Sequence, residues 1–228
     1  MKKMVIIIII LLLILIGMVV YRNITIKSNN QIGVQDVEKI ETYITKIYMW
    51  KEVTQEALPT FENINNASDI WTWEVVKKNL EDYELTYDQI QGKAKELFGS
   101  DFTKEFPKEG TEYLTYDEET NKYYAIGMGL DQEEDSFLLN EIKKTESGYE
   151  VEIVEYLEDY SQETGETNEN FSIVIKNLED EEIGKVQEEQ ESGSKDIVKE
   201  NIDKFTKKII SLKQEGDNIY VQKVSDKM

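Results

Sequence analysis

Carboxylates are the side chains of this sequence best suited to chemistry, because it contains 47 Asp and Glu residues but no His and no Cys. The two absences exclude nucleophile sites that depend on His or Cys, zinc sites built from thiolate or imidazole, and disulfides. Two approaching carboxylates, one of them desolvated, can run glycoside hydrolysis. With so many acidic residues, the sequence marks no single pair as special, so we predict no catalytic residue.

Two short segments have the composition of binding loops. Asp131–Asp135 offers oxygen ligands to Ca²⁺ but lacks the glycine-centred spacing of an EF-hand loop. Gly127–Gly129 follows an expected strand but opens no expected helix, which argues against a phosphate loop. We therefore interpret the first segment as a solvated turn, and we predict neither a metal site nor a cofactor.

Trp71 and Trp73 are the candidate contacts to a partner. They lie two residues apart on an expected helix, which places them on opposite faces. One ring can enter the core, and the other must be exposed, touch the strands or contact a partner. Core packing of at least one is the simpler interpretation, and a partner-binding tryptophan is the functional one.

The first 22 residues are typical of a membrane anchor. Two lysines precede an unbroken apolar run, Met4–Val20, which closes at Tyr21 and Arg22. A bilayer core about 30 Å thick needs roughly 20 helical residues, with about 17 as the lower end. A cleaved secretory signal is the alternative, but signal cores span about 7–15 residues and end in a small-x-small site that is missing here. We expect an uncleaved membrane helix over Met4–Tyr21, followed by a polar tether over residues 23–33.

Charge predicts the orientation of the chain and excludes some partners. Lys2 and Lys3 hold the short N-terminal side in the cytoplasm, although Arg22 and Lys27 weakly oppose this. The single-pass chain then carries its C-terminal domain outside the cytoplasm. These four are the only charged residues among the first 27, so the remaining chain, with 22 basic and 47 acidic residues, has a net charge of −25. Such a surface repels nucleic acid and anionic lipid headgroups, so we expect no nucleic-acid partner.

Residues 34–228 form one expected domain that begins with three helices. The first has Val37, Ile40, Ile44 and Ile47 at steps of three and four and extends to Pro59. The second spans about residues 68–83. The third has the clearest local signal: the spacing of Thr86 and Gln89 predicts a capping box, Leu85 and Ile90 a hydrophobic staple, and Gly99 a left-handed stop. Its expected buried stripe consists of Ile90, Ala94, Leu97 and Phe98.

After Gly110 the hydrophobic period changes to two, which predicts strands. Residues 179–193 are highly charged and are expected to form a loop, and a short helix is expected over residues 195–203. Helices first and a meander of strands afterwards predict an α+β fold, with three helices packed on a twisted antiparallel sheet of about six to seven strands. The expected strands are Glu112–Tyr116, Lys122–Met128, Ser136–Lys144, Tyr149–Tyr160, Phe171–Lys176, Phe205–Lys213 and Asn218–Val224. The first and second, the third and fourth, and the last two of these are each expected to pair as a hairpin.

Three stretches carry a resemblance: YDQIQGKAKELFG, NKYYAIGMG and KKTESGYEVEIVEYLEDY. Together they resemble the small, uncharacterised extracytoplasmic domains of Clostridium-like Gram-positive bacteria. The order of three helices and then a sheet, over about residues 34–224, is similar to the cone-shaped nuclear-transport-factor-like fold. Enzymes of that fold place Asp and His in the cone, and this chain has no His. The same order behind one anchor is similar to bitopic assembly subunits of conjugation and secretion machinery.

Two classes of function remain open at this point. The favoured one is a non-catalytic, membrane-tethered domain outside the cytoplasm that binds a protein or a cell-envelope component, with an assembly subunit of a secretion or conjugation machine as a variant. The other is a carboxylate-dependent envelope hydrolase. A cleft with two approaching carboxylates, one desolvated, would favour the hydrolase. The sequence specifies neither the ligand nor the oligomeric state.

Overall fold

The computed structural model describes residues 27–28, 32–126, 133–160, 172–187 and 193–227. The expected anchor, residues 1–22, lies outside these ranges, as does most of the expected tether. Within them, no helix is both long enough and apolar enough to cross a membrane. Ile126 and Glu133 are the described residues on either side of the Gly127–Gly129 segment.

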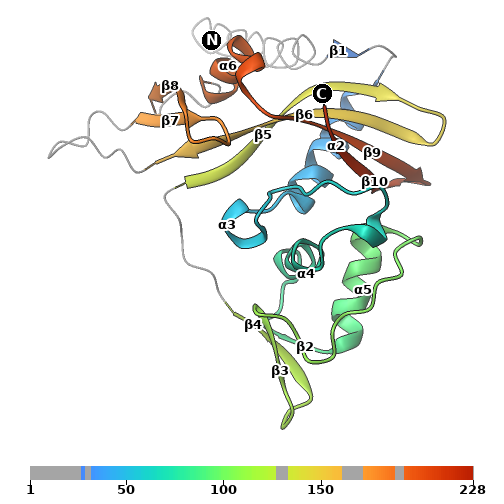
Figure 1. Cartoon of the computed structure of the whole chain (residues 1–228). Helices are drawn as coiled ribbons and strands as arrows, with labels where there is room; N and C mark the ends of the chain where they lie inside the picture. Colours follow the sequence, from blue (N-terminus) through green and yellow to red (C-terminus); the bar gives the residue numbers. More distant parts are fainter. Residues whose placement is uncertain (1–26, 29–31, 127–132, 161–171, 188–192, 228) are drawn as a thin grey trace, which may run out of the picture.

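The described chain has an α+β fold, with helices first and most strands afterwards (Figure 1). Helices α2, α3, α4 and α5 lie on one side of a large sheet, and α6 lies on the other. The order of the expected elements follows the sequence prediction, but helix α3, the 3₁₀ turn at Ile64–Asn66, strands β1, β2 and β8 and a second sheet are additional. The helices are α2 (Val34–Ile47), α3 (Lys51–Thr54), α4 (Asp69–Lys78), α5 (Tyr87–Phe98) and α6 (Gly193–Glu200), with 3₁₀ turns at Ile64–Asn66 and Ile202–Lys204.

The first helix is shorter than expected. Its stripe of Ile40, Ile44 and Ile47 is fully buried, as the spacing predicts. However, α2 ends at Ile47 instead of reaching Pro59, because Tyr48 adopts extended backbone with φ −81° and ψ 124°. The Tyr48 hydroxyl lies 3.2 Å from the carbonyl oxygen of Ser136 in the large sheet. A contact with the sheet therefore replaces the next helical turn.

The second helix also ends early. The helix begins close to the expected residue, and Ser68 caps it: its hydroxyl accepts a hydrogen bond from the Trp71 amide. The helix ends at Lys78 because the Asn79 side chain donates to the carbonyl oxygens of Val75 (2.8 Å) and Lys46 (2.9 Å), which joins the C-terminal ends of α4 and α2. The expected extension to Tyr83 is wrong: Tyr83 lies outside the helix and is 76% exposed.

The third helix forms as its local signals predict. The Thr86 hydroxyl accepts from the Gln89 amide at 3.3 Å, and the Gln89 side chain accepts from the Thr86 amide at 2.8 Å, which completes a capping box. The expected stripe of Ile90, Ala94, Leu97 and Phe98 is buried. Gly99 ends α5, as expected, with a positive φ of 84°, but its ψ of −176° lies outside the left-handed helical region that was predicted. A β-carbon placed there would lie 2.8 Å from the Tyr220 ring.

Gly99→Ala is expected to destabilise the protein by about 1–3 kcal/mol, because alanine at a positive φ is strained and its methyl group meets Tyr220. Gly92 in the same helix is the matched control, since nothing lies within 4 Å of a β-carbon there. Gly92→Ala should stabilise by about 0.5–1 kcal/mol, as alanine is the better helix former. Urea denaturation measures both, and equal effects of the two variants would contradict the role assigned to Gly99.

The strands form two sheets where the sequence predicted one. Six strands of the large sheet are antiparallel, and the two-residue β1 pairs parallel to β5. Its strands are β1 (Lys27–Ser28), β5 (Glu133–Lys144), β6 (Gly148–Asp159), β7 (Ser172–Lys176), β8 (Glu182–Gln187), β9 (Lys207–Glu215) and β10 (Asn218–Asp226). The small sheet comprises β2 (Glu84–Leu85), β4 (Lys122–Ala125) and β3 (Leu114–Asp117), in that order.

Two acidic segments differ from their expected loop structure. Glu133–Asp135 belongs to β5, and only Asp131 and Gln132 of the expected turn lie outside the described residues. Residues 182–187 form β8 and pair with β7, although residues 179–193 were expected to form a loop. Ile183 is partly buried and Val186 is buried in the core beneath α6, so two apolar side chains outweigh the charge of this segment.

Strand β6 organises the large sheet. One edge pairs with β5 along its length, and the other edge is divided: Gly148–Val154 pairs with β9, and Leu157–Asp159 pairs with β7. The main core lies between the sheet and helices α2, α4 and α5. A smaller core under α6 covers the opposite face and contains Leu138, Val154, Tyr156, Ile175, Val186, Val198 and Phe205.

The last strand closes the main core against the first part of the domain. Phe61 and Val224 exchange two backbone hydrogen bonds of 2.9 Å each. The Tyr43 hydroxyl donates to the Leu97 carbonyl oxygen at 3.0 Å and accepts from the Val221 amide at 2.8 Å. One side chain of α2 therefore joins α5 to β10.

Candidate functional site

Trp71 and Trp73 are both buried, with exposures of 0% and 2%. Their rings do lie among different aromatic neighbours: Trp71 packs against Phe61 and Phe98, and Trp73 packs against Phe102 and Phe106. Exposure of the second ring was one of three possibilities that the sequence left open, and it is not observed, because aromatic side chains cover α4 on both sides. Neither ring is accessible to a partner, and both belong to the core.

The third tryptophan, Trp50, lies at the surface. It is 38% exposed and lines a hollow of about 270 Å³ together with Tyr83 and Ile126, which are 76% and 46% exposed. These are three of the five large hydrophobic residues that are exposed in the described part of the chain. We call this feature the Trp50 hollow; it is lined by Met49, Trp50, Glu74, Lys77, Lys78, Leu80, Glu81, Asp82, Tyr83, Ala125 and Ile126.

The backbone around the hollow is held in place by regular structure. Trp50 lies between the C-terminal end of α2 and the N-terminal end of α3, and Tyr83 immediately precedes β2. The Ala125 amide at the end of β4 donates to the Tyr83 carbonyl oxygen at 3.0 Å. Three bulky apolar side chains thus project from fixed backbone without being buried. Clustered apolar groups of this kind mark interaction sites in soluble domains.

Sequence reasoning missed this site, although two weak signals were present. Trp50 falls outside the buried stripe of α2 and is followed by charged Lys51. Tyr83 is flanked by Asp82 and Glu84, so an aromatic ring interrupts an acidic run. Both patterns indicate a large apolar side chain at a polar surface. The convergence of the two segments with Ile126 requires the tertiary fold.

The two lysines of the hollow are engaged within the domain. Lys77 pairs with Glu74 at 3.4 Å, and its ammonium lies 4.8 Å from the Tyr113 ring centroid. Lys78 donates to the carbonyl oxygens of Thr45 (3.1 Å) and Tyr48 (2.7 Å) at the end of α2. Burial raises the pKa of the Glu74 carboxyl against the opposing effect of Lys77, and burial lowers the pKa of Lys78.

An acidic cleft of about 370 Å³ adjoins the hollow, and the two share Met49, Trp50 and Lys78. Glu134 and Asp135 at the start of β5 line it, and the Asp135 carboxylate accepts from the Lys51 amide at 2.6 Å. The remaining residues that line it are Glu41, Thr45, Tyr48, Ser136, Phe137, Tyr156, Glu158, Ser194 and Lys195. Trp50 therefore lies between an apolar hollow and a charged cleft.

A desolvated carboxylate lies beneath this cleft. Glu155 of β6 is 1% exposed, and burial raises the pKa of its carboxyl to about 7, although Lys208 and Tyr48 lower it. One carboxylate oxygen lies 3.3 Å from the Tyr48 hydroxyl, and the other lies 3.7 Å from the Lys208 ammonium. Asp135 is close enough to raise the pKa further. Asp135 and Glu155 are therefore the two carboxylates in this part of the structure that an envelope hydrolase could use.

The position of Glu155 limits what this pair can do. Its carboxylate contacts Tyr48 and Lys208, and it does not line the cleft. A general acid must reach the proton acceptor directly or through one water. Glu155 can hold a proton near neutral pH, but its contacts in this structure are to groups of the domain itself.

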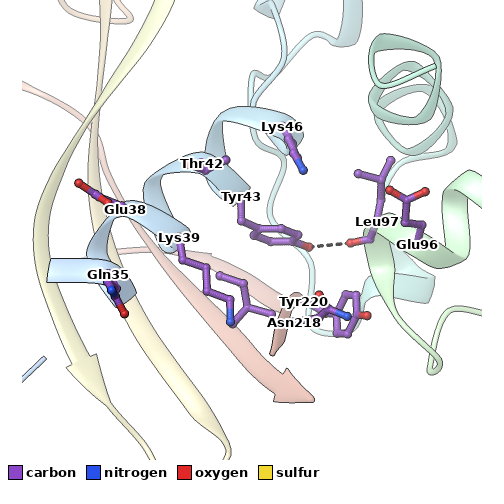
Figure 2. Close-up of a pocket in the computed structure, with 11 residues that line it drawn as sticks. Gln35, Glu38, Lys39, Thr42, Tyr43, Lys46, Glu96, Leu97, Asn218 and Tyr220 are labelled. Carbon is purple, nitrogen blue, oxygen red and sulfur yellow. Dashed lines mark hydrogen bonds between the residues drawn. The ribbon is translucent and has the colours of Figure 1, made fainter. Parts of the chain in front are cut away.

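A further groove, of about 470 Å³, lies between α2, α5 and β10. Figure 2 shows Tyr43 in its wall, with the hydroxyl directed at the Leu97 carbonyl oxygen. The charged side chains that line it are of both signs, Glu38 and Glu96 with Lys39 and Lys46. Burial raises the Tyr43 pKa well above its ordinary range, so the hydroxyl stays protonated and keeps its structural hydrogen bonds.

No described group of three or more Asp and Glu side chains has an arrangement that could hold a metal ion. Comparison of the chain with protein-family models, with curated proteins and with solved structures finds no match. The Trp50 hollow and the acidic cleft beside it are thus the features of the described surface from which a function can be argued.

Proposed function

We propose that this chain is a non-catalytic, membrane-tethered domain that lies outside the cytoplasm and binds a protein partner. The observation that carries the proposal is the Trp50 hollow, where Trp50, Tyr83 and Ile126 are exposed together. Aromatic side chains that are presented in this way are the usual anchors of protein interfaces. The apolar run Met4–Tyr21 supplies the tether.

The hollow is small, and the exposed apolar side chains around it favour a protein over a small molecule. Sites for small ligands and cofactors usually enclose about 300–1,000 Å³, whereas the hollow measures about 270 Å³. One bulky side chain from a partner fills such a volume, and the exposed Tyr83 ring can then pack over it. The surrounding surface would form the rim of the interface.

Two alternatives remain. An assembly subunit of a secretion or conjugation machine would use the same hollow, with another subunit as its partner. An envelope hydrolase would use Asp135 and Glu155, and the raised pKa of Glu155 is the observation in its favour. The 1% exposure of Glu155 is the observation against it, since a substrate in the cleft would not contact that carboxyl group.

The absence of Cys from the chain allows one labelling experiment to test both location and binding. Asp82→Cys places a thiol beside the hollow, and Glu118→Cys places one on the β3–β4 turn, where both side chains are exposed. In intact cells, a thiol reagent that cannot cross membranes should label Cys at both positions. Labelling at position 82 should be at least about threefold slower than at position 118, because the partner covers the hollow.

The purified full-length variants in detergent provide the reference, and there the slower labelling at position 82 should disappear. Labelling of neither position until the cells are lysed would place the domain in the cytoplasm. If the ratio of the two rates is the same in cells and in the purified protein, the hollow is unoccupied and the binding proposal fails.

A further inference from the structure

We infer that the surface formed by the Trp50 hollow and the acidic cleft binds a basic amphipathic segment of its partner, in which Lys or Arg residues flank a bulky apolar residue. This inference rests on the proposed protein-binding function and adds the chemistry of the segment that is bound. It follows from the apolar walls of the hollow, from the carboxylates on both sides of it, and from the charge of the whole domain.

The first step concerns the charges at the hollow itself. Glu81 and Asp82 line it and are exposed, and neither has an ion pair or hydrogen bond within the described residues. Lys77 and Lys78 are both directed to acceptors of the domain, as described above. The side chains that line the hollow are three acidic and two basic, so the hollow carries a net negative charge, and Glu81 and Asp82 are its exposed carboxylates.

The second step concerns the other side of Trp50. Glu134 and Glu158 line the cleft there, and Glu158 accepts a hydrogen bond only from the neutral Tyr160 hydroxyl within the described residues. Of the two cations that line the cleft, Lys195 is paired with Glu41 at 3.3 Å, and Lys78 lies near enough to Glu134 to interact with it electrostatically. Carboxylates thus lie on both sides of the apolar hollow. A segment with a central apolar residue and basic residues before and after it matches this order of charges.

The third step concerns long-range attraction. After residue 27 the chain carries 22 basic and 47 acidic residues, a net charge of −25. A field of this sign accelerates encounter with a basic partner and disfavours acidic ones. The apolar contact would supply affinity, and the surrounding carboxylates would select the partner by charge.

Trp50 provides the measurement, because Trp71 and Trp73 are buried and the chain contains three tryptophans. The probe is the capped peptide Lys-Lys-Leu-Leu-Lys-Lys, added to the full-length protein in a non-ionic detergent. It should protect Trp50 from quenching by acrylamide, and Trp50→Phe should abolish the signal. The peptides with Glu or Gln in place of Lys should bind at least about fivefold more weakly.

Charge variants locate the site. The double variant Glu81→Gln with Asp82→Asn should weaken binding of the basic peptide by about twofold to thirtyfold, since each exposed charge contributes about 0.2–1 kcal/mol. Glu118→Gln with Glu119→Gln removes the same number of charges at the exposed β3–β4 turn and should leave binding unchanged. Equal thermal stability of the two double variants would show that the comparison reports on binding.

Three results would overturn the inference. The first is equal protection of Trp50 by the Gln or Glu peptides, and the second is equal weakening by the two double variants. The third is no protection by any of the peptides. In each case, slower labelling of position 82 in cells would leave the protein-binding function standing with a partner of different chemistry. Loss of that slower labelling as well would remove both proposals.

Discussion

Replacing Lys208 by methionine is expected to lower the free energy of unfolding by about 3–5 kcal/mol at pH 8, because it leaves the buried Glu155 carboxylate without a cation. Lys208 is 5% exposed and lies 3.7 Å from Glu155, and its ammonium also donates to the carbonyl oxygen of Leu58 and to Glu56. Urea denaturation of the chain from residue 27 onward measures the loss. This variant removes the cation that compensates the buried carboxylate.

The loss of unfolding free energy caused by Lys208→Met should be smaller at about pH 5.5 than at pH 8. Burial raises the Glu155 pKa from 4.5 to about 7, so the native carboxyl keeps a proton that the unfolded chain releases. The stability from this group is fully present below pH 4.5 and is lost as the pH rises to about 7. The shift corresponds to about 3 kcal/mol. Glu155→Gln should remove this part of the pH dependence. The difference between the wild-type and Glu155→Gln plots of unfolding free energy against pH measures it.

Two further variants control for the loss of the lysine itself. Lys208→Met combined with Glu155→Leu should recover most of the lost stability, because a buried ion pair can be replaced by apolar groups at little cost. Lys223 pairs with Glu62 at 2.5 Å on the surface, so Lys223→Met should change stability by less than about 0.5 kcal/mol. If the Lys208→Met loss does not depend on pH, Glu155 is not the group responsible.

Trp71→Ala is expected to cost about 3–5 kcal/mol, as is typical for the loss of a fully buried aromatic ring. The ring lies 5.6 Å from that of Phe61 and 5.7 Å from that of Phe98, between centroids. Its indole nitrogen also donates to the Ile47 carbonyl oxygen at 3.1 Å. That oxygen is at the last residue of α2, so the variant removes a hydrogen bond as well as packing.

Trp50→Phe is the matched control for this variant, since Trp50 is exposed and its loss should cost less than about 1 kcal/mol. Urea denaturation, followed by circular dichroism because the tryptophan signal changes, compares the two. A loss below about 1 kcal/mol for Trp71→Ala would mean that α4 is not packed between two aromatic groups.

The sequence predicted those elements that are specified by neighbouring residues. The capping box of Thr86 and Gln89 placed the start of α5, and the expected stripe of that helix is buried. Alternation of apolar residues predicted the pairing of β5 with β6 and of β9 with β10. The interactions that give these signals lie within one helix or one hairpin, so they can be read from a short stretch of sequence.

The remaining features depend on contacts between distant residues. Tyr48 ends α2 because its ring reaches the sheet, and Asn79 ends α4 because its side chain bonds to the end of α2. The separation of β2, β3 and β4 into a second sheet is likewise a matter of tertiary packing. Glu155 was one of 47 acidic residues in the sequence, and only its burial distinguishes it.

The hydrogen bonds of Tyr43 with Val221 and of Phe61 with Val224 also determine when the domain can fold. Contacts between residues so far apart in sequence form late, because the intervening chain must first be closed into a loop. While β10 has not yet left the ribosome, Tyr43 lacks the Val221 amide and Phe61 lacks the Val224 backbone as hydrogen-bond partners. The folded core described here therefore cannot be completed before β10 has been synthesised. Premature termination before Val221 would leave a polypeptide for proteolysis and not a smaller working domain.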